Sequence, residues 1–201
     1  MFITPPRCPM EKVRLVDLIE LNHERILRVA LADQATEEEI QSALSEARIR
    51  QEDPLPSRIV FLLAYLLSLE NVHFVAQSQP VDVNQILSSP RARQFADRRI
   101  LAEEILACGS SAVLVPQCDT QLEMARETRR KVFLWQDRNR LVPKVILLTG
   151  CGMIALGKTS EDVCQLTEMT VKSAKTFVGA AILGGPVFMS PNIAVKIEDW
   201  S

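Results

Sequence analysis

Two short apolar segments joined by a glycine-containing turn constrain this chain's fold more than any other feature. Lys144 to Leu148 and Met153 to Leu156 are predicted as buried strands, and Gly150 and Gly152 between them favour a tight turn. A long helix is expected next, because Thr159 and Asp162 form a start signal for a helix running to about Leu183. Two adjacent strands followed by a long helix indicate a sheet covered by helices.

The first third of the chain is predicted to hold a hairpin and two helices. Residues 11–31 alternate in the manner of strands around Asn22-His23-Glu24-Arg25, which indicates a hairpin turn with a solvated His23. Thr36 and Glu39 form a capping box for an amphipathic helix over 37–49. The helix over 58–69 is apolar on nearly every face, so we expect it inside a domain or in a subunit contact.

Strands and helices also alternate through the middle of the chain. Residues 72–76 and 112–115 are predicted as strands, with a packed His73 in the first, and residues 82–88 and 91–107 as short helical pieces. A long helix is expected over 119–137, and its inward residues are predicted to be Leu122, Ala125, Val132 and Phe133. No linker interrupts this alternation, which favours one compact domain.

Composition excludes several classes of protein. The chain has 201 residues, 47% of them apolar, and 23 Lys and Arg against 25 Asp and Glu, so we expect no nucleic-acid binding and no binding to an anionic membrane. No signal peptide is evident, and the longest apolar run, Ile59 to Leu67, is far below the ~20 residues of a membrane span. The five cysteines are scattered and form no C-x-x-C pair, which suits a reducing compartment; the cytoplasm is the expected location. They are Cys8, Cys108, Cys118, Cys151 and Cys164.

Several motifs, in order along nearly the whole chain, resemble the class II aldolase/adducin family of sugar-phosphate aldolases and epimerases. They are Gln79-Pro80-Val81-Asp82, Ser89-Pro90-Arg91-Ala92, Cys108-Gly109, Lys144-Val145-Ile146-Leu147-Leu148, Gly152-Met153-Ile154-Ala155-Leu156-Gly157-Lys158-Thr159, Thr167-Glu168-Met169 and Gly184-Gly185-Pro186. The resemblance implies an α/β fold: a three-layer α/β/α domain with a central, mostly antiparallel sheet. It also implies a single domain over residues 1–201 that is short at its N-terminus relative to the family.

The family's chemistry uses zinc or another divalent metal held by three histidines, and a glutamate that moves a proton. By this resemblance, Gln77 and Gln79 stand at the His-x-His-Pro positions, and Cys151 stands in the Asn-His-Gly turn. Ser57 retains a phosphate-type serine, whereas the acid/base position is occupied by Ile59 or, in a register shifted by one, Arg58. Amide oxygens and one thiol do not make an open zinc site, so we expect no metal, no cofactor and no identifiable catalytic residue.

The candidate ligand-binding residues are therefore those of a vestigial pocket: Ser57, Arg58, Gln77, Gln79 and Cys151. Arg58 and Arg7 stand where the family handles phosphate and could clamp an anion, although exposed arginines are usually solvated. The two glutamines could bind a small polar ligand or hydrogen-bond each other or the turn. Cys151 could act as a nucleophile or redox thiol, or serve as a small apolar residue.

Two functions from different classes remain open at this point. The first is a degenerate family member that has lost aldol cleavage and acts as a binding or assembly domain, as in the adducin branch. The alternative is a divalent-metal-dependent aldolase or epimerase, an aldehyde-lyase acting on a phosphorylated sugar or related hydroxy-carbonyl compound, with a non-standard site using Cys151. The expected partners are further copies of the chain, a tetramer by family resemblance, and a small anionic or sugar-like ligand. A third interpretation is a truncated gene product whose active partner lies elsewhere.

Overall fold

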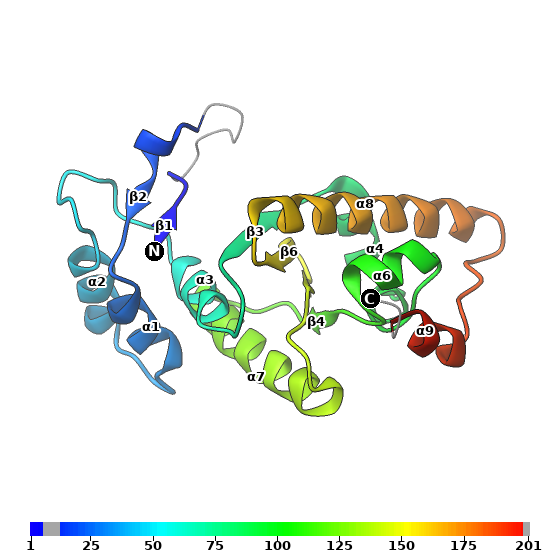
Figure 1. Cartoon of the computed structure of the whole chain (residues 1–201). Helices are drawn as coiled ribbons and strands as arrows, with labels where there is room; N and C mark the ends of the chain where they lie inside the picture. Colours follow the sequence, from blue (N-terminus) through cyan, green and yellow to red (C-terminus); the bar gives the residue numbers. More distant parts are fainter. Residues whose placement is uncertain (6–12, 199–201) are drawn as a thin grey trace. The chain divides into compact units, whose positions relative to one another are not determined.

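A four-stranded sheet organises the larger part of the chain in the computed structural model, which describes residues 1–5 and 13–198. The strand order is β3-β6-β5-β4, and Figure 1 labels three of these strands, β3, β6 and β4. The strands are β3 (Phe74–Ser78), β4 (Val113–Val115), β5 (Val145–Leu148) and β6 (Gly152–Gly157). β6 is antiparallel to both of its neighbours, and only β4 and β5 are parallel. The predicted α/β fold with a mostly antiparallel central sheet is confirmed.

Both faces of this sheet are covered. Val145, Leu147 and Met153 face one hydrophobic core, to which α4 (Val81–Leu87) and α8 (Ser160–Ile182) contribute. Ile146 and Ile154 point to the opposite face and are also fully buried. Apolar residues at every position of β5 are therefore explained by a sheet that lies between two layers.

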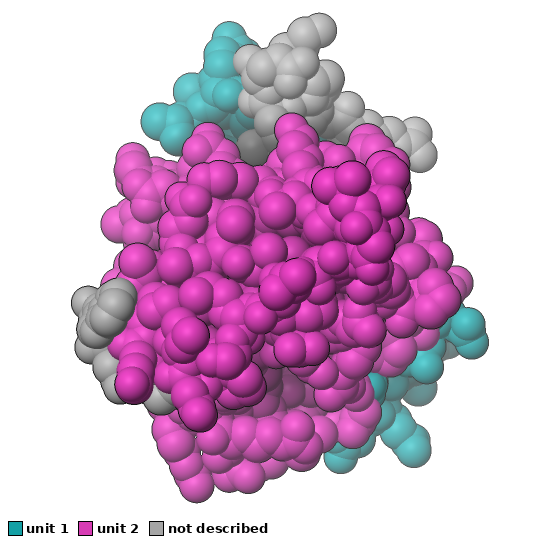
Figure 2. Space-filling view, turned by 90° about the vertical axis from the view of Figure 1, so that its right-hand side faces the viewer, with its two compact units in different colours: residues 1–68, 118–129 teal, residues 69–117, 130–201 magenta. Residues whose placement is uncertain are grey.

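The described chain separates into two compact units, which Figure 2 colours separately. Unit 1 comprises residues 1–68 and 118–129, and unit 2 comprises residues 69–117 and 130–201. The first half of α7 (Gln121–Asn139) belongs to unit 1 and its second half to unit 2. The expectation of a single domain stays a prediction, and Arg7 lies outside the described residues.

Unit 1 is mostly helical. Its helices are α1 (His23–Leu31), α2 (Glu37–Glu46) and α3 (Val60–Leu67), with a 3-10 turn η2 (Leu15–Asp17) and a two-stranded sheet of β1 (Phe2–Ile3) and β2 (Ile19–Glu20). α1 packs against both α2 and α3. The capping box of α2 forms as predicted, with the Thr36 hydroxyl accepting from the Glu39 amide at 3.2 Å. Six of the eight α3 residues are buried, so this apolar helix lies inside the protein.

The predicted hairpin over residues 11–31 is wrong, because His23 to Leu31 form a helix. Asn22 caps it by accepting a hydrogen bond from the Arg25 amide at 3.2 Å. Ile26 and Ala30, four residues apart, are its buried positions, so the apolar spacing here follows a helical period. His23 is not a solvated turn residue, since its Nε2 lies 2.8 Å from the Ala64 carbonyl oxygen.

Unit 2 confirms most of the remaining elements and corrects three details. α5 (Ala92–Asp97) and α6 (Ala102–Cys108) match the predicted helical pieces, whereas α9 (Pro191–Glu198), which packs on α6, was not predicted. Phe133 is 67% exposed although it was expected to face inward. His73 is exposed rather than packed. Within the described residues, no helix has the length and apolar composition to span a membrane.

The turn between β5 and β6 joins two parts of the sheet. The Cys151 amide donates to the Leu148 carbonyl at 2.9 Å, and Gly150 and Gly152 both have positive φ, +80° and +89°. A Cβ on Gly152 would lie 2.2 Å from the Ser78 carbonyl oxygen, whereas a Cβ on Gly150 would meet nothing within 4 Å. Only glycine therefore allows this turn to lie against the end of β3.

These two glycines form a matched pair for a stability test. Gly150→Ala should lower the free energy of unfolding by about 1–2 kcal/mol, because it adds only the strain of a positive φ. Gly152→Ala should cost a further 1–3 kcal/mol or so, because its Cβ also collides with the β3 backbone. Urea unfolding followed by circular dichroism measures both; equal losses would contradict the close approach of the turn to β3.

Candidate functional site

The structure brings three of the sequence-predicted site residues to one end of the unit 2 sheet. Gln77 lies in β3 opposite Ile154 of β6, and Gln79 follows the last residue of that strand. Cys151 lies in the β5–β6 turn next to Gly152, which has no side chain and so leaves room for Ser78 and Gln79. The turn that carries Cys151 and the strand end that carries Gln79 are therefore direct neighbours.

Gln77 faces away from the α4–α8 core, because its neighbour Ala76 on β3 packs against that core. Gln79 follows the end of β3, and both glutamines are exposed. Ser78 between them points to the other face, where its hydroxyl is buried. Among the described residues, neither this hydroxyl nor the buried Oδ1 of Asn84 on α4 has a hydrogen-bond partner. This sheet end therefore offers exposed amides and, in Ser78, a buried hydroxyl with unused hydrogen-bonding capacity.

The donor atoms at this sheet end do not fit a catalytic zinc ion. Such a site uses three strong protein ligands, typically imidazoles or carboxylates, and keeps one position open. Gln77 and Gln79 offer neutral amide groups, and Cys151 offers one thiol. In the part of the chain that the structure describes, no group of three or more His, Cys, Asp or Glu residues is placed to hold a metal ion.

The other predicted site residues belong to unit 1, just before α3. Ile59 is the N-cap residue of that helix and makes no side-chain cap, and Ser57 is exposed. The Arg58 guanidinium forms an ion pair with Glu37 at the start of α2. Hydrogen bonds from Gln41 and Arg58 hold the pKa of the Glu37 carboxyl below its usual value. Arg58 thus already has an anionic partner, and its predicted role in binding a ligand stays a prediction.

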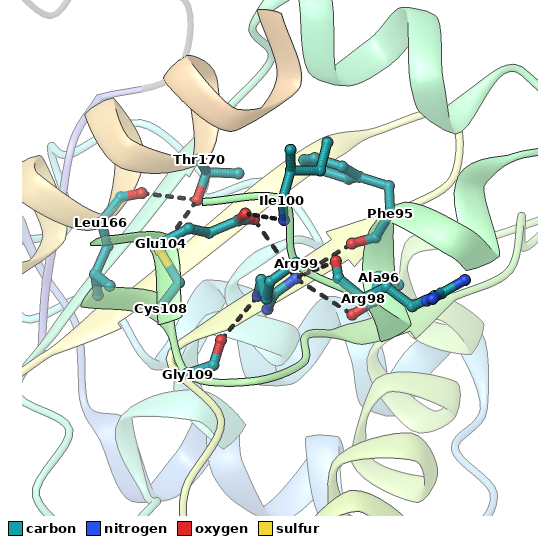
Figure 3. A network of polar contacts seen from close by, with 10 residues as sticks. All are labelled: Phe95, Ala96, Arg98, Arg99, Ile100, Glu104, Cys108, Gly109, Leu166 and Thr170. Atoms are coloured by element: carbon teal, nitrogen blue, oxygen red, sulfur yellow. Dashed lines mark hydrogen bonds and ion pairs between the residues drawn. The ribbon is translucent and has the colours of Figure 1, made fainter. Parts of the chain in front are cut away.

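A buried ion pair in unit 2 was missed by sequence reasoning. Arg99 and Glu104 are 4% and 3% exposed, and their side chains approach to 3.6 Å (Figure 3). The Arg99 guanidinium also donates to the carbonyl oxygens of Gly109 and Phe95, at 2.8 and 3.2 Å. In the sequence Arg99 follows Arg98, and Glu104 follows Glu103. Adjacent residues of like charge are typical of exposed positions, so no local sequence signal indicates that Arg99 and Glu104 form a buried pair.

Two further groups complete this buried network. The Cys108 sulfur lies 3.8 Å from the Thr170 hydroxyl, which donates to the Leu166 carbonyl at 2.7 Å. Burial raises the pKa of the Cys108 thiol and of the Glu104 carboxyl, although Arg99 acts in the opposite direction on both. The adjoining cavity measures only about 10 Å³, roughly the space of one water molecule. The network therefore links α6 and its flanking loops to α8 and has no room for a substrate.

Comparison with solved structures shows the fold. An N-terminal class II aldolase domain from Thermoplasma acidophilum is 18% identical, with a TM-score of 0.67 over 88% of this chain and 74% of that chain. L-fuculose 1-phosphate aldolase is 12% identical, with a TM-score of 0.69 over 100% of this chain and 79% of that chain. The Escherichia coli protein YgbL, a putative aldolase/epimerase/decarboxylase, is 11% identical, with a TM-score of 0.67 over 98% of this chain and 81% of that chain.

These likenesses confirm the class II aldolase fold expected from the sequence motifs. No family model matches the sequence, and no curated protein matches it significantly. At identities of 11% to 18% the similarity concerns the fold, and the chemistry depends on this chain's own residues.

Because the Arg99–Glu104 pair is buried, we expect substitution of Arg99 to destabilise the protein much more than substitution of an exposed arginine. Arg99→Met should lower the free energy of unfolding by about 3–5 kcal/mol, because it leaves the Glu104 carboxylate buried without its cation. Arg93→Met is the control: it breaks the exposed Arg93–Asp97 pair and should cost about 0.5 kcal/mol or less. The double variant Arg99→Met/Glu104→Leu should recover most of the loss in urea unfolding. A single variant as stable as the control would contradict a buried pair.

The raised pKa of Glu104 predicts a pH-dependent stability difference. The folded state binds the Glu104 proton more tightly than the unfolded state, whose pKa is near 4.5. The carboxyl therefore favours folding below that pH and loses this contribution as the pH rises through the folded-state pKa. The unfolding free energy of the wild type, minus that of Glu104→Gln, should fall as the pH increases above 4.5. A difference that stays constant or grows with pH would contradict this assignment.

Proposed function

We propose that this chain is a class II aldolase-fold protein that has lost metal-dependent aldol cleavage and acts as a binding or assembly domain. One observation carries the proposal. The sheet end that unites Gln77, Gln79 and the Cys151 turn presents two amides and one thiol at the positions where the family resemblance implies three imidazoles. The fold that would position a metal site is present, while the ligands for the metal are not.

The chemistry explains why this change is decisive. Metal-assisted cleavage of a carbon–carbon bond requires a Lewis acid that stabilises the enediolate, and a base that moves a proton. Neutral amide oxygens suit hard ions in larger oxygen cages rather than an open zinc site. Neither Ile59 nor Arg58, at the position that the resemblance gives to the base, can accept a proton at neutral pH.

The binding role is supported by the polar groups that remain. The Gln77 and Gln79 amides each offer donors and an acceptor on an exposed face, which suits the hydroxyl groups of a small sugar-like ligand. Such a ligand needs no metal, because its recognition depends on hydrogen bonds to neutral groups.

The assembly role is supported by exposed apolar side chains where α8 ends. Ile182, Leu183 and Val187 are 84%, 88% and 87% exposed, and the chain turns at Gly184 and Gly185 between them. Large apolar residues that are close in sequence and this exposed are typical of a contact with another chain. The proposed assembly is a homo-oligomer in the cytoplasm, with the tetramer as the form implied by the family resemblance.

Elemental analysis of the purified protein tests the loss of metal chemistry. The wild type, purified without chelator, should contain well under one zinc, manganese or iron ion per chain, because two neutral amides and a single thiol do not make a three-ligand site. Stoichiometric metal would instead favour the alternative, a metal-dependent aldolase or epimerase that uses Cys151.

Restoring the ligands tests the geometry of the same site. The variant Gln77→His/Gln79→His/Cys151→His should bind about one zinc ion per chain, because three imidazoles then converge on one sheet end. The triple variant Gln77→His/Gln79→His/Cys151→Ala is the matched control and should bind zinc more weakly, because it offers only two imidazoles. Zinc uptake that is identical in the two variants would show that position 151 lies away from the glutamines.

Sedimentation velocity tests the assembly role. The wild type should sediment as an oligomer at micromolar concentration, and Leu183→Lys should shift it towards the monomer because a charge would be buried in the contact. Leu15→Lys is the control, since Leu15 is also 88% exposed but lies in unit 1. A monomeric wild type, or equal dissociation by both variants, would contradict the proposed contact.

A further inference from the structure

A hollow lies wholly within unit 2, at the end of the sheet opposite to the one that carries Gln77, Gln79 and Cys151. Its volume is about 400 Å³, within the usual size of small-molecule pockets. Its walls come from the residues before β3, the end of α6, the loop before β5, the end of β6 and the first turns of α8. We call this hollow the β6-end groove.

The β6-end groove is separate from the sheet end that carries the glutamines. It includes Gly157, the last residue of β6, whereas the Cys151 turn precedes Gly152, the first residue of that strand. Five residue steps along an antiparallel strand span roughly 17 Å. None of Gln77, Gln79 and Cys151 lines the groove, so a ligand bound here would not contact them.

The interior of the groove is apolar. Val72, Leu156 and Leu166 are 5%, 4% and 6% exposed and line it where the sheet meets α8. Leu106 from α6 also lines the groove but remains 41% exposed. A Cβ on Gly157 would lie 2.6 Å from the Asp162 Cβ, so this glycine allows the first turn of α8 to approach the end of β6. An apolar molecule bound here would cover the Leu106 side chain.

Four charged residues border this apolar interior: Lys144, Lys158, Glu70 and Asp162. The two carboxylates accept hydrogen bonds from nearby amide groups, whereas the two ammonium groups keep unused donors. The Asp162 carboxylate accepts from the Lys158 and Thr159 amides, both at 2.9 Å, as the cap of α8. The Glu70 carboxylate accepts from the Asn71 amide group at 3.3 Å. Both acids are thus engaged by neighbouring groups of their own segments.

The lysines keep unused donors. The Lys144 ammonium donates one hydrogen bond, to the Ala107 carbonyl at 3.0 Å, and has two further protons. The Lys158 side chain is exposed and, within the described part of the chain, its ammonium makes no hydrogen bond or ion pair; Asp162 is the nearby charge that attracts it. The groove therefore combines an apolar interior with cationic donors that lack a full set of acceptors.

We propose that the β6-end groove binds a small organic anion with an apolar body, whose anionic group pairs with Lys158 and Lys144. The apolar body would contact Leu106 and Leu166, and the anionic group would stay at the edge, where the lysines reach it. Lysine acts as a point charge on a flexible stem, so the site selects for charge and apolar bulk rather than for a planar two-pronged group. This inference does not depend on the proposed function, because the two sites share no residue.

Octanoate is a suitable probe, with 1-octanol and inorganic phosphate as matched analogues that lack the charge or the apolar chain. Titration of the isotope-labelled full chain, followed by amide chemical shifts in nuclear magnetic resonance, should show saturable octanoate binding with the largest shifts at Gly157 and Lys158. Octanol and phosphate should each bind at least about fivefold more weakly, because each loses one of the two contributions. Raising the salt concentration should weaken octanoate binding.

Two variants and a control locate the site. Lys158→Gln and Leu106→Gln should each weaken octanoate binding by about fivefold or more, through loss of the charge and of the apolar wall respectively. Lys175→Gln, which changes an exposed lysine on α8 outside the groove, should leave the affinity unchanged.

Each contrary outcome overturns the proposal. Binding of octanoate that is insensitive to Lys158→Gln, or equal binding of octanol, would show that charge is not recognised. Phosphate binding as tight as that of octanoate would show that the apolar interior contributes nothing. The absence of saturable binding, or shifts centred on Leu183, would show that the groove is not the site.

Discussion

The contact between the β5–β6 turn and the end of β3 is the constraint on which the rest of the unit 2 sheet depends. Gly152 is the first residue of β6, and the Ser78 carbonyl oxygen occupies the space that a side chain at this position would need. Because glycine has no side chain, β3 can pair with β6 from Phe74 to Ser78. A slip of one residue would turn every side chain of β3 to the other face and expose Ala76 and Ser78 in place of the glutamines. The same contact places Gln79 beside Cys151, so the residues at these positions contribute to one site.

Local patterns were sufficient to predict the elements whose signals lie within a few residues. The β5 and β6 strands, the capping boxes at Thr36 and Thr159, and the end of α8 at Ile182, just before Gly184 and Gly185, all follow from short-range chemistry. The helix α1 was mistaken for a strand because its few buried residues, Ile26 and Ala30, fit more than one period when the partners α2 and α3 are unknown. The exposed Phe133 shows the same limit: an apolar residue in a helix does not reveal which face is covered.

For the candidate site, too, some features were predictable from the sequence and others were not. That Gln77, Gln79 and Cys151 lie at one sheet end was predictable from the family resemblance, since both segments flank recognisable strands. The Arg99–Glu104 pair and the β6-end groove were not, because each depends on which segments meet in space. Nothing in the sequence around Arg99 distinguishes a buried arginine from a solvated one, and the groove draws its walls from five separate segments. Burial is a property of the folded chain rather than of a motif.

Main-chain hydrogen bonds close the turn at the sheet end that carries the glutamines. The Cys151 amide binds the Leu148 carbonyl at 2.9 Å and the Thr149 amide binds the Val115 carbonyl at 3.0 Å, so the turn is closed by main-chain hydrogen bonds. A structural zinc site contributes directly to folding, and its loss unfolds the domain. Here the side chains at positions 77, 79 and 151 can change without weakening those bonds. The class II aldolase fold therefore persists whether or not the ligands for a metal are present, which is why similarity of fold at 11% to 18% identity does not establish aldolase chemistry.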